Sequence, residues 1–287
     1  MKKKLVSIII PVFKNIHFLK RSLHSSVHQT YKNTEIIIID DGNTKNEKKE
    51  IKEVRQKFKK KEITIIYLKK NKGVSNALNV GIKKSRGEYI SWLSHDDYFD
   101  LNKTQMQIKH LNKTNAKICS CDFIEINKIK NFRLNRSLDK NYFDDQVLSI
   151  ILNDSLHGCS LLIKKECFEE FNFNKKYKHI QDYDLWTKMS EKYLIVHLKK
   201  RLLYTFKHVS QTSYLKKDES VTEKLYFYKD LVNKKLVFYN YSQFIYVIKF
   251  IYRSIFMYKS LSLGFLVFQK FLFNKYYNYL RLYLKKN

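Results

Sequence analysis

Residues 35–41 read EIIIIDD, four consecutive isoleucines followed directly by two aspartates. A run that is apolar at every position predicts a strand covered on both faces, as in a parallel sheet with helices on either side. Three further runs have the same character, namely LVSIII at 5–10, ITIIYL at 63–68 and EYISWL at 88–93. The first hundred residues therefore contain four candidate strands of one buried sheet.

Helical patterns lie between these runs, and Asn15 is placed to cap the first of them. Apolar residues recur at helical spacing in three segments, namely Ile16, Leu19, Leu23 and Val27, then Ile51, Val54 and Phe58, then Val74, Ala77, Leu78, Gly81 and Ile82. Strands and helices in strict alternation imply right-handed crossovers. The sequence thus predicts an α/β fold with a mainly parallel sheet flanked by helices.

The next hundred residues continue with mixed elements. The patterns predict a helix at 102–111, a strand near 117–126, a glycine-containing turn into a strand at 157–163 and a helix at 181–193. That helix directs Leu185, Trp186 and Met189 toward the core and carries acids in its first turn. A strand at 193–198 and the segment LLYTFKHVSQTS at 202–213 close a domain that we place at residues 1–213.

The charge of the chain is strongly positive. It has 56 Lys and Arg against 27 Asp and Glu, a formal net charge of +29, which suits phosphate-rich partners such as nucleic acid, anionic lipid or nucleotides. The four cysteines show neither the paired spacing of a zinc site nor a disulfide framework, and predict buried thiols in a reducing compartment. The apolar run near the N-terminus reaches Pro11 too soon for a signal peptide. A cytoplasmic protein is expected.

Residues 214–287 differ in composition from the domain before them. After Asp230 there is no acid, while ten Lys or Arg are interleaved with seventeen Phe or Tyr. The longest uncharged run, 236–248, is shorter than the roughly 20 residues that cross a bilayer. Ser242, Lys249, Arg253 and Ser260 share one narrow stripe of an otherwise apolar helical wheel. This pattern predicts a helical extension lying on an anionic membrane surface, or alternatively one packed on the domain or on a second subunit.

Two pairs of adjacent aspartates follow predicted strands, Asp40 with Asp41 and Asp96 with Asp97. In an open parallel sheet, ligands bind beyond the carboxyl ends of the strands, where both pairs are expected. Adjacent carboxylates repel and resist burial unless a cation or a hydrogen-bond donor compensates them. A bound divalent metal would do so, although aspartate is also common in turns and at helix caps.

Five blocks in order carry a family resemblance: VSIIIPVFKN at 6–15, IIIIDDGNT at 36–44, NKGVSNALNVGIKKSRGEYISWLSHDDYF at 71–99, QDYDLW at 181–186 and FKHVSQTS at 206–213. The chain resembles the family-two inverting glycosyltransferases of the GT-A fold over about residues 4–213. The resemblance implies transfer of a sugar from a nucleotide-diphosphate sugar, UDP-linked by the habit of the family, to a hydroxyl of a growing surface glycan or glycolipid. Residues 1–100 would form the nucleotide-binding half and residues 101–213 the acceptor-binding and catalytic half.

The resemblance also implies roles for matching positions. Asp97 would ligate Mn²⁺ or Mg²⁺ together with His208, and Asp96 would lie against the ribose or the metal shell. Asp182 matches the catalytic base, with Asp184 as the alternative. Pro11 and Phe13 would line the nucleotide base, and Asp41 would accept a hydrogen bond from it. The loop that contains Asn71 and Gly73 would approach the nucleotide.

Departures from the family pattern concern the donor. Ser94 stands where many relatives have a further aspartate, Leu78 replaces a frequent arginine, and Gln181 precedes the base where glutamate is common. Two other classes compete with the enzyme: a basic nucleic-acid-binding protein, and a catalytically silent module of the same fold. The acids gathered at an expected ligand site disfavour the first, and the intact Asp97 and Asp182 disfavour the second. We therefore expect no nucleic-acid partner and a protein peripheral to the inner face of the cytoplasmic membrane, in a form compatible with an oligomer.

Overall fold

The computed structural model describes residues 4–58, 62–138, 156–211 and 215–235, together with 146, 150, 252, 265–266 and 268–269. The chain divides into two units, residues 1–138 with 156–214, and residues 139–155 with 215–287. The first unit contains every predicted site residue. Of the predicted C-terminal extension, the structure describes helix α9 (Lys217–Lys235), and most of the basic aromatic segment lies outside the described residues. Within the described ranges, no helix has the length and apolar character needed to cross a membrane.

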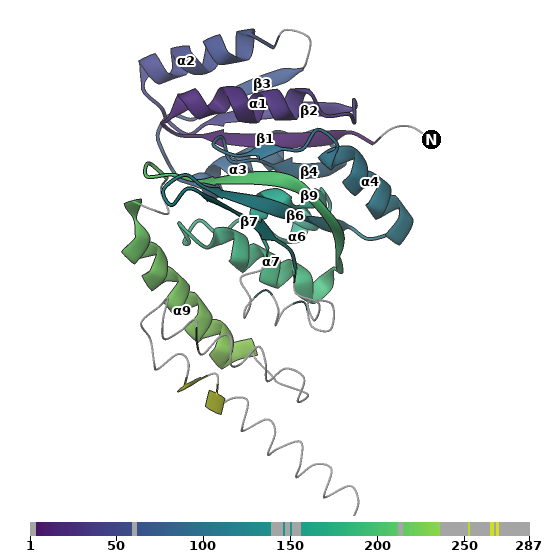
Figure 1. Ribbon diagram of the computed structural model, residues 1–287, viewed down its shortest axis with the longest axis vertical. Coiled ribbons are helices and arrows are strands. Elements are labelled where there is room, and N and C mark those ends of the chain that lie inside the picture. Colours follow the sequence, from purple (N-terminus) through teal and green to yellow (C-terminus); the bar gives the residue numbers. More distant parts are fainter. Residues whose placement is uncertain are drawn as a thin grey trace, which may run out of the picture. The chain divides into compact units, whose positions relative to one another are not determined.

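A single mixed sheet forms the centre of the first unit (Figure 1). Among the described residues its strand order is β3-β2-β1-β4-β8-β6-β9-β5, with β7 beside β6. The strands are β1 (Val6–Val12), β2 (Thr34–Asp40), β3 (Ile63–Tyr67), β4 (Tyr89–Trp92), β5 (Tyr98–Phe99), β6 (Ile118–Asn127), β7 (Phe132–Arg136), β8 (Leu162–Lys164) and β9 (Ile195–Lys207). The α/β prediction is confirmed, and the four predicted strands pair in parallel, β1 with β2 and β4, and β2 with β3.

The four isoleucines of β2 are buried on both faces of the sheet, each at most 3% exposed. Ile36, Ile37, Ile38 and Ile39 pair in parallel with β1 on one side and with β3 on the other. Helix α3 packs closely on β1 and β2, because a Cβ at Gly81 would lie 2.5 Å from a side-chain atom of Ile9. The continuous apolar run is therefore explained by burial on both faces.

The helices of the described residues are α1 (Leu19–Val27), α2 (Lys45–Gln56), α3 (Val74–Lys84), α4 (Lys103–Thr114), α6 (Cys167–Glu170), α7 (Gln181–Lys192) and α9, with 3₁₀ turns η1 (Ile16–Phe18) and η3 (Gly158–Ser160). The capping role expected of Asn15 is wrong. Asn15 has a left-handed φ of 46° and no side-chain capping bond, because the chain enters α1 through η1, where Asn15 C=O accepts from Phe18 N–H. Helix α2 instead has a capping box formed by Thr44 and Glu47.

The second half of the sheet is mixed. Strand β8 is antiparallel to β4 and β6, whereas β9 is parallel to β6. The strand expected at 193–198 and the start of the closing segment 202–213 form one strand, β9, whose register shifts opposite Asp122. His197 lies 2.9 Å from Ser120 Oγ and 2.8 Å from an Asp122 carboxylate oxygen, which fastens β9 to β6. All four cysteines are buried free thiols, as expected: Cys119, Cys121, Cys159 and Cys167.

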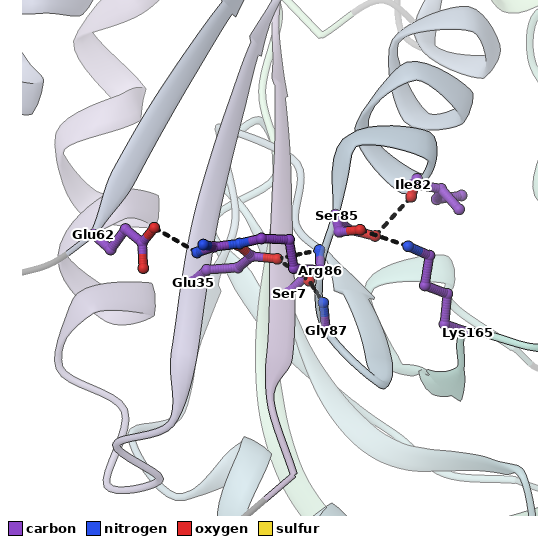
Figure 2. A network of polar contacts seen from close by, with 8 residues as sticks. All are labelled: Ser7, Glu35, Glu62, Ile82, Ser85, Arg86, Gly87 and Lys165. Atoms are coloured by element: carbon purple, nitrogen blue, oxygen red, sulfur yellow. Dashed lines mark hydrogen bonds and ion pairs between the residues drawn. The ribbon is translucent and has the colours of Figure 1, made fainter.

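A polar network holds together the amino ends of the strands (Figure 2). The buried Glu35 accepts from Ser7 Oγ at 2.6 Å, from Arg86 N–H at 2.6 Å and from Arg86 Nε at 3.0 Å. Ser7 in turn accepts from Gly87 N–H at 2.9 Å, and Arg86 also contacts Glu62. The network joins β1, β2 and the turn before β4, so the opposite, carboxyl ends of these strands are fixed in a common frame.

Candidate active site

The acid pair lies at the carboxyl end of β4, as predicted. After Trp92 the last ladder bond runs from Leu93 N–H to Ile9 C=O at 2.9 Å, and Asp97 N–H then closes a turn on Ser94 C=O at 3.1 Å. Strand β5 begins at the next residue. The turn thus presents two consecutive carboxylates at the end of the sheet where ligands bind in open α/β folds.

Asp96 is paired with His208. The Asp96 carboxylate lies 3.0 Å from His208 Nε2, and Nδ1 of the same ring lies 2.9 Å from Ser210 Oγ. Burial alone would raise the pKa of Asp96, but the hydrogen bond with His208 and the nearby charges of His95 and His208 outweigh it and lower that pKa. The structure therefore brings together two residues that the sequence placed 112 positions apart.

Asp97 is more deeply buried, at 3% exposure. One of its oxygens accepts from Phe206 N–H at 3.0 Å, and burial and the charge of Asp96 raise its pKa well above the usual range. Donor atoms of Asp97, His157 and Cys159 lie within 4.8 Å of one another. However, burial keeps the Cys159 thiol protonated by raising its pKa, and His157 Nδ1 accepts from Cys159 N–H at 3.3 Å. This trio is thus arranged as a packed polar cluster around Asp97.

Arg21, which the sequence did not single out, supplies a positive charge beside the acid pair. Its guanidinium donates to the Asp96 carbonyl and stacks on the Phe206 ring, with 3.6 Å between Cζ and the ring centroid. The charges of Asp97 and Asp96 both act on it. The backbone N–H of Phe206 also donates to the Asp97 carboxylate, so Arg21 and Phe206 together support both aspartates. Arg21 lies in α1, and an arginine in a helix gives no local sign of a partner 75 residues away.

Asp41, at the carboxyl end of β2, anchors the loop before α3. Its two carboxylate oxygens accept from Lys72 N–H at 3.1 Å and from Gly73 N–H at 2.9 Å. Burial raises the pKa of Asp41 despite these two donors. Asn71 Oδ1 also accepts from Gly73 N–H, at 3.1 Å. The three predicted nucleotide-binding positions Asp41, Asn71 and Gly73 are therefore in contact.

Gly42 is a site residue that the sequence did not reveal. Its φ is +78°, and a Cβ there would lie 2.3 Å from backbone atoms of Lys70 and Asn71. A side chain at this position would displace the loop, and the left-handed conformation is a second reason why glycine is favoured here. The need for glycine is set by a loop that is distant in the sequence, so the DDG motif alone indicated no more than a turn.

Asn43 fastens the loop after β1 to the loop after β2. Its Nδ2 donates to Asp40 at 2.6 Å and to Val12 C=O at 2.9 Å, and its Oδ1 accepts from Lys14 N–H at 2.7 Å. Pro11 is buried opposite Ile39 in the β1–β2 ladder, whereas Phe13 is 38% exposed. Phe13 is thus available at the rim to a ligand, and Pro11 is part of the strand beneath it.

The predicted base lies in the first turn of α7. Asp182 is half-buried, and its Oδ1 accepts from Tyr183 N–H at 2.9 Å. Asp184, the alternative base, is buried at 6% exposure and forms an ion pair with Lys188 Nζ at 2.7 Å. Leu185, Trp186 and Met189 are fully buried, as predicted. Asp184 is thus engaged within its own helix, and the role of Asp182 as the base stays a prediction.

Comparison with known sequences identifies relatives. A model of the family described as "Glycosyl transferase family 2" matches residues 7–171. A Rickettsia prowazekii (strain Madrid E) protein described as an uncharacterized glycosyltransferase, RP339, is 38% identical over 191 residues. That alignment covers 64% of this chain and 58% of the relative, so this chain spans little more than half the length of that protein. The Escherichia coli UDP-Glc:alpha-D-GlcNAc-diphosphoundecaprenol beta-1,3-glucosyltransferase WfgD is 28% identical over 189 residues, 65% of this chain and 70% of WfgD.

Solved structures share the fold. S. aureus TarS 1–349 in complex with UDP-GlcNAc has a TM-score of 0.63 at 15% identity, covering 88% of this chain and 73% of that one. Mannosyltransferase PcManGT from Pyrobaculum calidifontis, in complex with GDP-Man and Mn²⁺, has a TM-score of 0.65 at 13% identity, covering 93% and 74%. Identities this low show the architecture alone, while the family match extends over more than half of the chain. The chain therefore belongs to glycosyl transferase family 2 and has the mixed α/β sheet of the GT-A glycosyltransferases.

Proposed function

We propose that the protein is an inverting, metal-dependent glycosyltransferase that moves a sugar from a UDP-linked donor to a hydroxyl of a lipid-linked surface glycan. The contact between Asp96 and His208, at the carboxyl end of β4, carries the proposal. Strands β2 and β4 flank β1, so the loop anchored by Asp41 and the acid pair lie at the same end of the sheet. A nucleotide diphosphate whose base binds at the Asp41 loop would extend its phosphates toward the acid pair.

The donor would be held by the loops after β1, β2 and β3. Each carboxylate oxygen has a second lone pair, so Asp41 can accept a hydrogen bond from a nucleobase while it holds Lys72 and Gly73. Phe13 would cover the base above Pro11, and Asn71 and Gly73 would approach the phosphates. The UDP-GlcNAc of the TarS complex and the UDP-Glc in the name of WfgD support a uridine nucleotide.

The residues present fit a divalent metal. Asp96 and His208 offer an oxygen and a nitrogen donor 3.0 Å apart, and His95 Nε2 is a buried nitrogen without a hydrogen-bond partner among the described residues. A mixed carboxylate and imidazole set suits Mn²⁺ better than Mg²⁺. A bound ion would act as a Lewis acid toward the charge that develops on the departing diphosphate. We assign Asp96 and His208 as ligands and the more buried Asp97 as the carboxylate that orients the turn, the reverse of the roles expected for the two aspartates.

Asp182 would act as the general base. It would accept the proton of the acceptor hydroxyl while the oxygen bonds to the anomeric carbon, on the face opposite the leaving diphosphate. The bond between that carbon and the phosphate oxygen breaks with its electron pair on the diphosphate. One displacement inverts the anomeric configuration, so an α-linked donor gives a β-glycoside. The diphosphoundecaprenol acceptor in the name of WfgD supports a lipid-linked acceptor.

A thermal-shift screen of UDP and GDP sugars, with and without Mn²⁺, tests the donor and the metal together, because a ligand that binds the native state raises its stability in proportion to its affinity. We expect a Mn²⁺-dependent rise with a UDP sugar that is lost in Asp96→Asn and kept in the matched control Asp100→Asn. An unchanged response in Asp96→Asn contradicts the metal assignment. Retention of an oligonucleotide without protection by UDP and Mn²⁺ would instead favour a nucleic-acid partner.

The base has its own test. Asp182→Asn should keep the thermal shift with donor and Mn²⁺ but lower the transfer rate by about 10²–10⁴, the usual contribution of general base catalysis. Asp184→Asn should affect stability more than rate, since Asp184 is already paired with Lys188. A near-normal rate in Asp182→Asn would reassign the base.

A further inference from the structure

Residues 171–180, which we name the strap, join α6 to α7 and lie along α3. Asn79 of α3 holds the strap with both ends of its side-chain amide: Nδ2 donates to Phe173 C=O at 2.8 Å, and Oδ1 accepts from Phe173 N–H at 3.0 Å. One turn earlier on α3, Ser75 Oγ donates to Tyr177 C=O at 3.3 Å. The side-chain amide of Asn79 thus satisfies both backbone hydrogen-bonding groups of Phe173, as a neighbouring strand would.

Phe173 connects the strap to two other elements. Its side chain is 1% exposed and meets Trp92 edge-on, with centroids 6.4 Å apart, and Trp186 edge-on at 5.9 Å. Trp92 is the last residue of β4, just before the acid pair, and Trp186 lies one turn after Asp182 on α7. The position of Phe173 therefore fixes the distance between the end of β4 and the first turns of α7.

Helix α3 reaches the donor loop at its other end. It begins at Val74, directly after Gly73, whose N–H is bound by Asp41. One rigid helix of eleven residues thus contacts the Asp41 loop at its start and the strap at Ser75 and Asn79. The contacts form a continuous chain from the loop that would hold the nucleotide to the helix that carries the proposed base.

We propose that Asn79 is a positioning residue: by clamping Phe173 it sets the place of α7, and through α3 it couples donor binding at the Asp41 loop to the orientation of Asp182. The catalytic half of this inference rests on the proposed function. Asparagine suits the role because it donates and accepts at once, whereas aspartate only accepts and alanine does neither. A displacement of about 1 Å at a reacting group can cost about 100-fold in rate.

The two tryptophans of the chain make the clamp observable without turnover. In a Trp92→Phe background, Trp186 is the sole tryptophan and reports on α7 and the strap. Asn79→Ala should raise acrylamide quenching of Trp186 at least about twofold, and it should abolish the emission change that UDP with Mn²⁺ produces in the parent. Lys83→Ala, one turn later on α3 and exposed, is the matched control and should match the parent. Should Asn79→Ala not fold, Asn79→Asp keeps the acceptor for Phe173 N–H and should give an intermediate effect.

Kinetics then separate positioning from general damage. With an active UDP sugar, Asn79→Ala should lower kcat about 10- to 100-fold while the donor KM stays within about threefold, and Asn79→Asp should recover part of the loss. Unchanged Trp186 quenching, or a fall in kcat matched by an equal loss of donor affinity, would overturn the inference. If the parent transfers no sugar from any donor tested but Trp186 still responds to UDP and Mn²⁺ through Asn79, the coupling stands and the proposed function alone is rejected.

Discussion

Replacing Asp97 by asparagine should stabilise the metal-free protein. The Asp97 carboxyl is fully buried, and its pKa is raised by burial and by Asp96. It accepts a hydrogen bond from Phe206 N–H, which an asparagine oxygen can also accept. Two like charges 4–8 Å apart repel by about 2–4 kcal/mol at an effective dielectric constant of about 20. Arg21 and His208 offset part of this repulsion. We therefore expect Asp97→Asn to raise the free energy of unfolding by about 1–2 kcal/mol, or Tm by about 2–8 °C for a unit of this size.

The pH dependence gives the sign of the effect. Because the folded pKa of Asp97 lies above the unfolded value, the folded state binds the proton more tightly, and wild-type stability falls as pH rises from about 4 toward the folded pKa. Asp97→Asn lacks this decline. Chemical unfolding in EDTA between pH 4 and pH 8 measures the difference, with Asp100→Asn, a half-buried aspartate that accepts from Asn102 N–H, as the control. If Asp97→Asn is no more stable than wild type at pH 8, the claim that the ionised Asp97 carboxylate lowers the free energy of unfolding is refuted.

Two further predictions concern the frame around the site. Gly42→Ala should destabilise the fold by about 3–5 kcal/mol, because its Cβ would overlap the backbone of Lys70 and the residue would also be strained in the left-handed conformation. Gly73→Ala, whose Cβ meets nothing within 4 Å, should cost only the conformational strain of about 1–3 kcal/mol. Urea unfolding compares the two variants, and equal losses of stability would contradict the packing argument. Glu35→Gln should cost about 1–3 kcal/mol at pH 7, and because the bonds from Ser7 and Arg86 outweigh burial and lower the pKa of Glu35, the difference from wild type should shrink as pH falls below about 4.5. A difference that is constant from pH 3 to pH 7 would show that the charge of Glu35 is not what the network stabilises.

The sequence predicted the parts of the fold that depend on local pattern. The four apolar strands and helix α3 follow from continuous or periodic burial, which the residues show directly. The sequence did not predict that β9 continues beyond residue 198, because the exposed residues 199–201 interrupt the apolar pattern where the register of β9 shifts against β6. Asn15 was misjudged because the entry into α1 is set by the turn from β1 rather than by a capping side chain.

The site shows the same division. Both acid pairs could be placed at strand ends, since Asp40 directly follows an apolar run and Asp96 follows another after Ser94 and His95. Arg21 and Gly42 could not be found, because the need for each arises from backbone that is remote in the sequence, the Asp96 carbonyl and the loop at Lys70. The roles of Asp182 and His208 came from the family resemblance and stay predictions. The structure adds that His208 contacts Asp96.

The acid pair and the residues that bind it are far apart in the sequence, which affects when the site can form during synthesis on the ribosome. Phe206, which binds Asp97, and His208, which binds Asp96, follow them by 109 and 112 residues. At translation speeds of about 5–20 residues per second, the ribosome needs about 5–20 s to supply them. During that interval the first three helices and four parallel strands can form from near-neighbour contacts, while the two carboxylates still face solvent. The centre that would bind sugar nucleotides is thus completed only when β9 joins the sheet.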